Sequence, residues 1–427
     1  MLTLRKYASV LGGLVPPPGL PRSLAAQSLM FALGAGTFMA GSTVFFTKVI
    51  GLSPVQIGLG IGLASAASSL GSLPFGVLID RIGAKRAWVI GSLTEALLFA
   101  LYPFVPGFAA FLALVVAMAV MQTISGMSVQ VYSIAALPEG ERVRGQAYQR
   151  SALNVGLTAG GAIAGLALAV DTVLAYQLMV FAIAALLGLA AVFIARLPQL
   201  PAAHAPVDRR RWFTVLREPS ILSTSGLVGA LQAHQTILLV VLPLWVINHT
   251  DAPLPLVAGL FAVNTVLVVL FQVKASTGAE TAAGSAQALR QSGLLIALAC
   301  VVFAAAALTD DLVTIAALVV GAVALTAGEL RHAAGSWGAT SALAPEHRRG
   351  EYVGTFKLGS QLQNMVSPAG FTTLALATGG WGWLVIAACF VVAGVLVVPT
   401  VAWAQRVMAC AATSEETRQQ QPVAVQA

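Results

Sequence analysis

The sequence predicts an all-α membrane protein whose twelve transmembrane helices form two pseudo-symmetric bundles of six. Three observations carry this prediction: an apolar composition, basic residues confined to alternate loops, and a weak repeat between the two halves. Of 427 residues, 58% are hydrophobic and only 9% are charged, whereas soluble domains carry about 25% charged residues. So few charges cannot cover a soluble surface, but lipid tolerates them because each spanning helix satisfies its own backbone hydrogen bonds.

Apolar segments of about 20 residues, the length that crosses the hydrocarbon core, follow one another along the chain. We expect spans near 24–49, 54–79, 87–105, 108–136, 146–170, 173–196, 220–247, 254–274, 291–309, 312–341, 351–378 and 381–404. The longest polar break, which contains three consecutive arginines, separates the sixth span from the seventh. The chain therefore divides into a lead-in, a bundle, a linker, a second bundle and a disordered tail, at 1–23, 24–197, 198–219, 220–405 and 406–427.

The basic residues predict the orientation of these spans. All of the 23 basic residues except Lys48, Arg331 and Lys357 fall on one side of the membrane in this map. Loops rich in Lys and Arg stay in the cytoplasm, so we expect the linker and both termini there, in a protein of the plasma membrane. The net charge of +7 then belongs to these loops, since a nucleic-acid partner would require a basic soluble face.

Two short matches relate the halves. Arg144-Gly145, after the fourth span, corresponds to Arg349-Gly350, after the tenth, at an offset of 205 positions (349 minus 144). The residues around Gly76, at the end of the second span, match those around Gln272 in the same way. Two parallel repeats of six spans are an architecture of secondary transporters.

The loop after the second span carries the most specific motif. It places a glycine, an Asp-Arg pair, a second glycine and a basic pair at Gly76, Asp80, Arg81, Gly83, Lys85 and Arg86. This spacing resembles the signature loop of the major facilitator superfamily. The resemblance implies the major facilitator fold, with a loop that latches the two halves together on the cytoplasmic side.

The chemistry of the motif can be stated residue by residue. Gly76 lets helices approach closely and Gly83 permits a tight turn. Asp80 can accept hydrogen bonds from the N-terminus of a neighbouring helix, and the three basic residues can bind acidic side chains or anionic lipid headgroups. The alternative is that the basic residues only set topology. Because Gln272 and Ser276 replace the Gly and Asp in the second half, we expect one latch, not two.

The fifth span is rich in glycine, with Gly156, Gly160, Gly161 and Gly165 as its packing positions. It is similar to the fifth helix of the superfamily's proton-driven antiporters, although their usual Gly-Pro step is missing. This similarity implies an exporter. The alternative is a face of small residues that only packs against another helix. The fourth span also lacks the arginine that the superfamily's drug exporters often carry.

Polar residues at membrane depth are costly and are therefore candidates for contact with substrate or with a coupled proton. The candidates are Gln122, His234, Gln235, Glu329, Arg331, His332, Lys357 and Gln361. In the superfamily, spans seven, ten and eleven contribute to a central cavity, so we expect the candidates on these spans to converge. The alternative for Glu329 is a static ion pair with an arginine or lysine. Glu95 has lower priority because the third span is peripheral in this fold.

Together these features favour a secondary active transporter, specifically a proton-coupled exporter of a small organic compound such as a drug or a secreted metabolite. We expect a monomer in contact with membrane lipids, with no enzymatic activity, cofactor, metal or nucleic-acid partner. One alternative is an importer or facilitator of a sugar or organic ion. Another is a membrane-embedded enzyme or receptor, which is disfavoured because the sequence contains no metal-ligand cluster and no nucleophile elbow.

Overall fold

The computed structural model describes residues 15–200, 214–378 and 380–420. Helices dominate these ranges, and no β-strand occurs in them. The first half contains α2 (Leu20–Lys48), α3 (Pro54–Ile82), α4 (Ala84–Leu101), α5 (Phe108–Ala136), α6 (Arg142–Val170) and α7 (Val173–Ala195). The second half contains α8 (Pro219–Gln232), α9 (His234–Thr236), α10 (Leu242–His249), α11 (Pro255–Ala275), α12 (Ala282–Ala306), α13 (Asp311–Leu343), α14 (Arg349–Ala377) and α15 (Trp381–Gln420).

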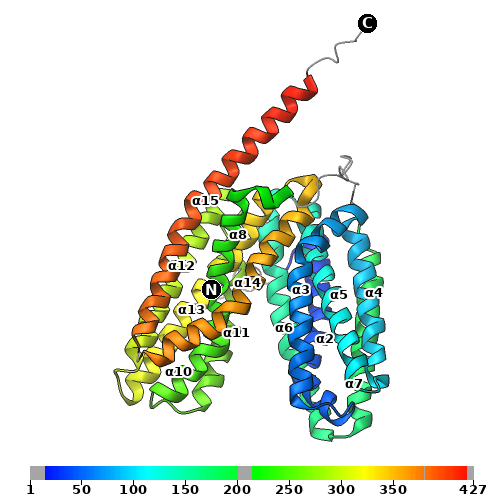
Figure 1. The fold of residues 1–427 in the computed structure, drawn as a ribbon, viewed down its shortest axis with the longest axis vertical. Helices are drawn as coiled ribbons and strands as arrows, with labels where there is room; N and C mark the ends of the chain where they lie inside the picture. Colours follow the sequence, from blue (N-terminus) through cyan, green and yellow to red (C-terminus); the bar gives the residue numbers. More distant parts are fainter. Residues whose placement is uncertain (1–14, 201–213, 379, 421–427) are drawn as a thin grey trace, which may run out of the picture.

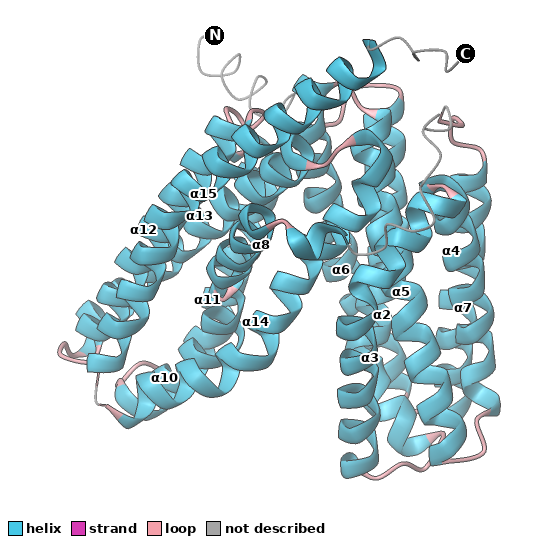
Figure 2. Ribbon diagram, turned by 45° about the horizontal axis from the view of Figure 1, so that its top comes forward, coloured by secondary structure: helices cyan, strands magenta, loops and turns pink. Residues whose placement is uncertain are grey.

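The helices form two bundles, α2–α7 and α8–α15, which confirms the predicted fold class (Figures 1 and 2). The bundles meet at one end of the molecule, where α3 ends and α4, α8 and α14 begin, and this is called the linker end below. Here α3 packs on α14, and α6 packs on α11 and α13. At the opposite end the bundles diverge (Figure 1). The molecule is therefore closed at the linker end and open at the other.

Eleven helical stretches within the described ranges are long and apolar enough to cross a membrane. The expected eleventh span, α14, is not among them, although it has 29 residues like several of its neighbours. Its middle carries Lys357, Gln361, Gln363 and Asn364. Because α14 packs against α3 in one bundle and against α8 and α15 in the other, its polar residues need not face lipid.

The seventh span is interrupted. It consists of α8, the single turn α9, a π-helical segment at Ile237–Val241, and α10. Pro243 lies in the first turn of α10, and a proline ring clashes with the carbonyl four residues earlier while donating no hydrogen bond. The wider π-helical turn relieves that clash, and such bulges are common at functional sites. His234 begins the single turn α9, two residues after the end of α8.

Aromatic side chains fill the core of each bundle. In the first, Phe46 packs edge-on against Phe111 and Phe38 against Phe99, each pair with ring centroids 4.8 Å apart. In the second, the buried Trp245 donates a hydrogen bond from Nε1 to the Phe303 carbonyl oxygen at 2.9 Å. Buried indole N–H groups need such a partner. Each bundle thus has its own core, which allows it to move as a unit.

The glycines of α6 divide into two faces. A Cβ on Gly156 would lie 2.7 Å from the Leu29 carbonyl oxygen, and one on Gly160 would lie 2.2 Å from that of Leu33. Both glycines therefore let α6 press against the backbone of α2. A Cβ on Gly161 or Gly165 would meet nothing within 4 Å, so the packing role predicted for these two is wrong. They lie roughly 140° and 180° around the helix from Gly156, at 100° per residue.

We expect Gly160→Val to lower the melting temperature of the purified protein, because overpacking against the α2 backbone costs about 1–3 kcal/mol or more. Gly161→Val is the matched control, since it places the same β-branched residue in the same helix without a contact within 4 Å. Thermal unfolding in detergent measures both. Equal losses in the two variants would show that helix propensity, not packing on α2, sets the effect.

The end of the chain differs from the expectation of a disordered tail over 406–427. The structure continues α15 to Gln420, because the residue types beyond Arg406, mainly Ala, Glu, Gln, Thr and Arg, include several good helix formers. Residues 421–427, and 201–213 of the predicted linker, lie outside the described residues.

Candidate functional site

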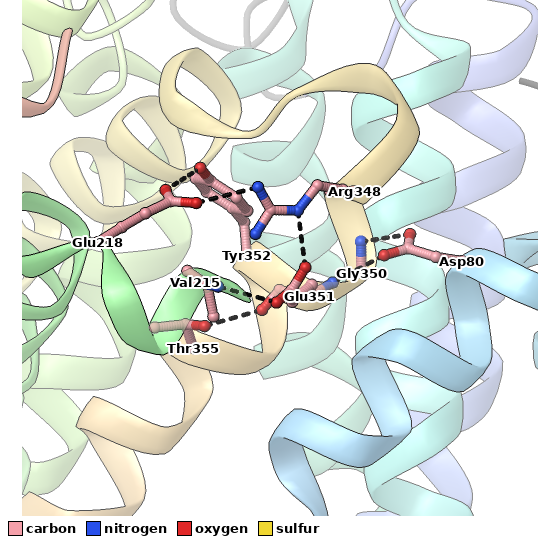
Figure 3. A network of polar contacts seen from close by, with 8 residues as sticks. All are labelled: Asp80, Val215, Glu218, Arg348, Gly350, Glu351, Tyr352 and Thr355. Carbon is pink, nitrogen blue, oxygen red and sulfur yellow. Dashed lines mark hydrogen bonds and ion pairs between the residues drawn. The ribbon is translucent and has the colours of Figure 1, made fainter. Parts of the chain in front are cut away.

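The contact between α3 and α14 at the linker end depends on Asp80. Its Oδ1 accepts a hydrogen bond from the Gly350 backbone N–H at 2.6 Å, and its Oδ2 accepts one from Glu351 at 2.9 Å (Figure 3). These amides lie in the first turn of α14, where N–H groups lack partners within the helix and the helix dipole favours an anion. The structure therefore places Asp80 on a helix N-terminus of the other half, as its position in the motif led us to expect.

Gly76 lies one turn before Asp80 and brings the two backbones together. A Cβ on Gly76 would lie 2.1 Å from the Gly350 carbonyl oxygen, and a Cβ on Gly350 would lie 2.2 Å from that of Gly76. Neither position has room for a side chain while the linker end is closed. The matching Arg-Gly pairs found in the sequence thus include one glycine, Gly350, with a direct role in this contact.

A network of ionic contacts ties the start of α14 to α8 in its own half. Arg348 donates from Nε to Glu351 at 2.7 Å and from a terminal nitrogen to Glu218 at 2.9 Å (Figure 3). The Tyr352 hydroxyl also donates to Glu218, and Glu351 accepts from the Val215 N–H at 3.0 Å. Burial disfavours the charge on Arg348, but Glu351 and Glu218 outweigh it and raise the pKa of the guanidinium. The N-terminus that receives Asp80 is therefore held rigidly.

The remaining residues of the motif act within the first half or at its surface. Gly83 has a φ of 88° between α3 and α4, which glycine adopts without strain. Lys85 donates to the carbonyl oxygens of Ala195 and Leu197 at 2.9 and 2.5 Å, so it caps the end of α7 instead of binding an acidic side chain. Arg81 and Arg86 are exposed at the linker end.

A second contact between the halves joins α6 to α13. Arg150 lies 3.5 Å from the Glu329 carboxylate, which also accepts a hydrogen bond from Asn264 at 2.7 Å. Arg150 was expected in a cytoplasmic segment, but it lies two turns inside α6. Arg331, two residues after Glu329, donates instead to the Ala275 carbonyl oxygen at the end of α11. Residues i and i+2 on a helix face different directions, which explains why Arg331 and Glu329 are apart.

His234 and His332 form a buried pair beside this contact, with ring centroids 5.1 Å apart and exposed fractions of 2% and 5%. His234 Nδ1 lies 2.9 Å from the Leu231 carbonyl oxygen, and His332 Nε2 lies 3.0 Å from that of Val228. Each ring can therefore donate to the end of α8. His234 Nε2 has no hydrogen-bond partner among the described residues. Gln235 is half-buried and is not part of the pair.

A cavity of about 620 Å³ lies between the halves. It is lined mostly by α2, α3, α4 and α5 of the first half, while α14 of the second half contributes Lys357 and Gln361. Three sequence-predicted candidates therefore line it: Gln122, Lys357 and Gln361. Its volume is within the range of about 300–1,000 Å³ that is usual for small-molecule sites.

The candidates on spans seven and ten meet in the buried His234–His332 pair, but in this conformation only those on span eleven line the cavity. Glu329, His234 and His332 are buried and do not line the cavity, whereas Lys357 and Gln361 do. Conversely, Glu95 on α4 lines the cavity, although it had low priority as a candidate. The missed signal was the cost of an acidic residue at membrane depth, which applies wherever the helix lies.

One family model matches most of the chain. The family model described as Major Facilitator Superfamily matches residues 24–368. The crystal structure of FucP, a transporter of that superfamily in the outward conformation, matches with a TM-score of 0.68 at 15% identity, covering 89% of this chain and 98% of that chain. FucP is the E. coli fucose:proton symporter.

Two further solved structures are similar. An outward-facing bacterial homologue of the iron transporter ferroportin has a TM-score of 0.65 at 14% identity, covering 90% of this chain and 99% of that one. The human organic anion transporter MFSD10 has a TM-score of 0.62 at 14% identity, covering 89% and 100%. No curated protein sequence matches this chain. At such low identities these structures establish the fold alone.

Proposed function

The chain belongs to the Major Facilitator Superfamily, and on that premise we propose that it is a proton-coupled exporter of a small organic compound. Membership of this family makes it a multi-pass membrane protein and a secondary transporter. The proposal concerns the direction of transport, the coupling ion and the residues that couple them. The inter-half ion pair between Arg150 and Glu329 is the observation that carries it.

Orientation is the first step of the argument. The linker end carries basic residues at the starts of α4, α6 and α14, such as Lys85, Arg86, Arg144 and Arg349. Under the positive-inside rule, this end faces the cytoplasm. The structure, closed at the linker end and open at the other, then corresponds to an outward-facing state. Export requires a switch to the inward-facing state, in which the contacts of Asp80 and Glu329 with the other half separate.

Protonation of Glu329 provides that switch. A carboxylate that binds a proton loses its negative charge, and its attraction to Arg150 falls with it. The other groups near Glu329 are Asn264, Thr326 and the His234–His332 pair, none of which is acidic. Protonation from the outside therefore weakens the linker-end closure without help from the substrate. This order suits an antiporter, in which the proton returns the carrier to the inward-facing state after the substrate has left.

Transport in proteoliposomes with an imposed pH gradient tests the proposal. Compounds that raise the melting temperature of the purified protein are first identified, because a ligand that binds the folded state stabilises it. We expect a proton gradient, acidic on the face opposite the linker end, to drive such a compound toward that face. A transport rate that is the same with and without the pH gradient would rule out proton coupling. Transport in the same direction as the protons would indicate a symporting importer.

A further inference from the structure

The cavity contains one acidic and one basic side chain, contributed by opposite halves. Glu95 comes from α4 and Lys357 from α14. Glu95 is only 1% exposed, and its Oε1 has no hydrogen-bond partner among the described residues. Lys357 is exposed, and no ion pair or hydrogen bond of its ammonium group occurs within the part of the chain that the structure describes.

Both groups therefore lack a partner of opposite charge among the described residues, although Glu95 has the Ser125 hydroxyl as a hydrogen-bonding neighbour. An ionisable group at membrane depth is costly unless a partner of opposite charge or a set of hydrogen bonds compensates it. The other charged groups at membrane depth between the halves satisfy this rule, because Glu329 has Arg150 and Asn264. Glu95 and Lys357 also do not pair with each other. What would compensate both is a molecule in the cavity between them.

The other residues that line the cavity indicate the chemistry of the ligand between its charged groups. Aromatic rings of Phe31, Phe38, Phe99 and Tyr102 border the cavity, together with the amides of Gln122, Gln130 and Gln361. Aromatic faces attract apolar groups and also cations, while amide groups can donate or accept hydrogen bonds. The site thus combines separated charges with a largely apolar wall.

We propose that the transported compound is a dipolar ion, with a cationic group that binds Glu95, an anionic group that binds Lys357 and an apolar body between them. This inference rests on the proposed transport function. Because the two charges belong to different halves, such a ligand would bridge them. A compound with a single charge would leave the other group unpaired. The bridge would favour the transition in which the halves close around the substrate.

A matched set of probes tests this inference by binding alone. The zwitterion 4-(aminomethyl)benzoate has an anionic counterpart, 4-methylbenzoate, and a cationic counterpart, 4-methylbenzylamine, on the same ring. A series of aliphatic ω-aminocarboxylates of increasing length varies the separation of the charges. Thermal unfolding of the full chain in detergent, titrated with each probe, measures the apparent affinity. At least one zwitterion is expected to bind about tenfold or more tightly than the matched single-charge compounds, because each lost charge pair costs affinity.

Two variants test which side chain binds which charged group of the ligand. In Glu95→Gln the zwitterion should bind no better than the matched anion, and in Lys357→Gln no better than the matched cation. Glu141→Gln and Lys274→Gln, at exposed positions outside the cavity, are the controls and should keep the preference. The inference is overturned if no zwitterion in the series binds, if single-charge compounds bind equally well, or if either cavity variant keeps the preference. Proton coupling could still hold in all three cases, because the pH-gradient assay tests it separately.

Discussion

Glu329→Gln is expected to reduce proton-driven transport by at least about tenfold, because glutamine cannot gain or lose a proton and forms no ion pair with Arg150. The variant mimics the protonated carboxyl group in both conformations, so the rate should no longer respond to external pH. Substrate counterflow, which needs no proton gradient, should persist. The comparison of gradient-driven flux with counterflow in proteoliposomes separates a coupling role from a general loss of structure.

Two controls sharpen the Glu329 experiment. Glu346→Gln changes a carboxylate at the linker end that is 84% exposed and pairs with Arg349, three residues later, and it should leave the pH response unchanged. Arg150→Gln combined with Glu329→Gln should behave like Glu329→Gln alone, since both substitutions remove one interaction. A Glu329→Gln variant that keeps a normal pH response would place the coupling site elsewhere.

Gly76→Val is expected to prevent closure of the linker end. Its Cβ would lie 2.1 Å from the Gly350 carbonyl oxygen, and a backbone cannot yield as the tip of a flexible side chain can. An overpacking cost of about 1–3 kcal/mol in the closed state alone shifts the ratio of closed to open molecules by roughly 5–150-fold. Transport should fall accordingly, because the cycle requires both states.

Distances between spin labels measure this shift directly. Labels at positions 86 and 346, both exposed at the linker end in opposite halves, should report a single short distance in the parent protein. Gly76→Val should add or favour a longer one. Gly58→Val lies on the same helix with nothing within 4 Å of its Cβ and should leave the distance unchanged. If Gly76→Val keeps the short distance, the two helices do not need a glycine for closure.

The part of the site that local sequence could predict is the part that depends on a short motif. Asp80 and Gly76 lie within one loop and helix end, and their chemistry implies a neighbouring helix N-terminus and a close approach. The match between Arg144-Gly145 and Arg349-Gly350 also indicated the equivalent position in the second half. The identity of the partner still required the structure, because Asp80 and Gly350 are 270 positions apart.

Interactions between distant helices were not predictable in this way. Arg150 was counted with the cytoplasmic charges because it lies near the start of a span, and only the packing of α6 on α13 brings it to Glu329. Glu95 was set aside because its helix is peripheral, yet its side chain lines the cavity. The rotation of a helix about its axis decides such contacts, and a nearly uniform apolar sequence encodes that rotation weakly.

The sequence by itself determined that this protein is a two-bundle membrane protein of the major facilitator type. These conclusions depend on local properties. The length of an apolar segment decides whether it spans the bilayer, the basic residues of a loop decide its side of the membrane, and the carboxylate of the Asp80 motif suits a helix N-terminus. Only the tertiary structure decided where the two halves touch, that the linker end is closed, and which polar residues line the cavity. These features depend on close packing and on charges paired across hundreds of residues, which no local pattern specifies.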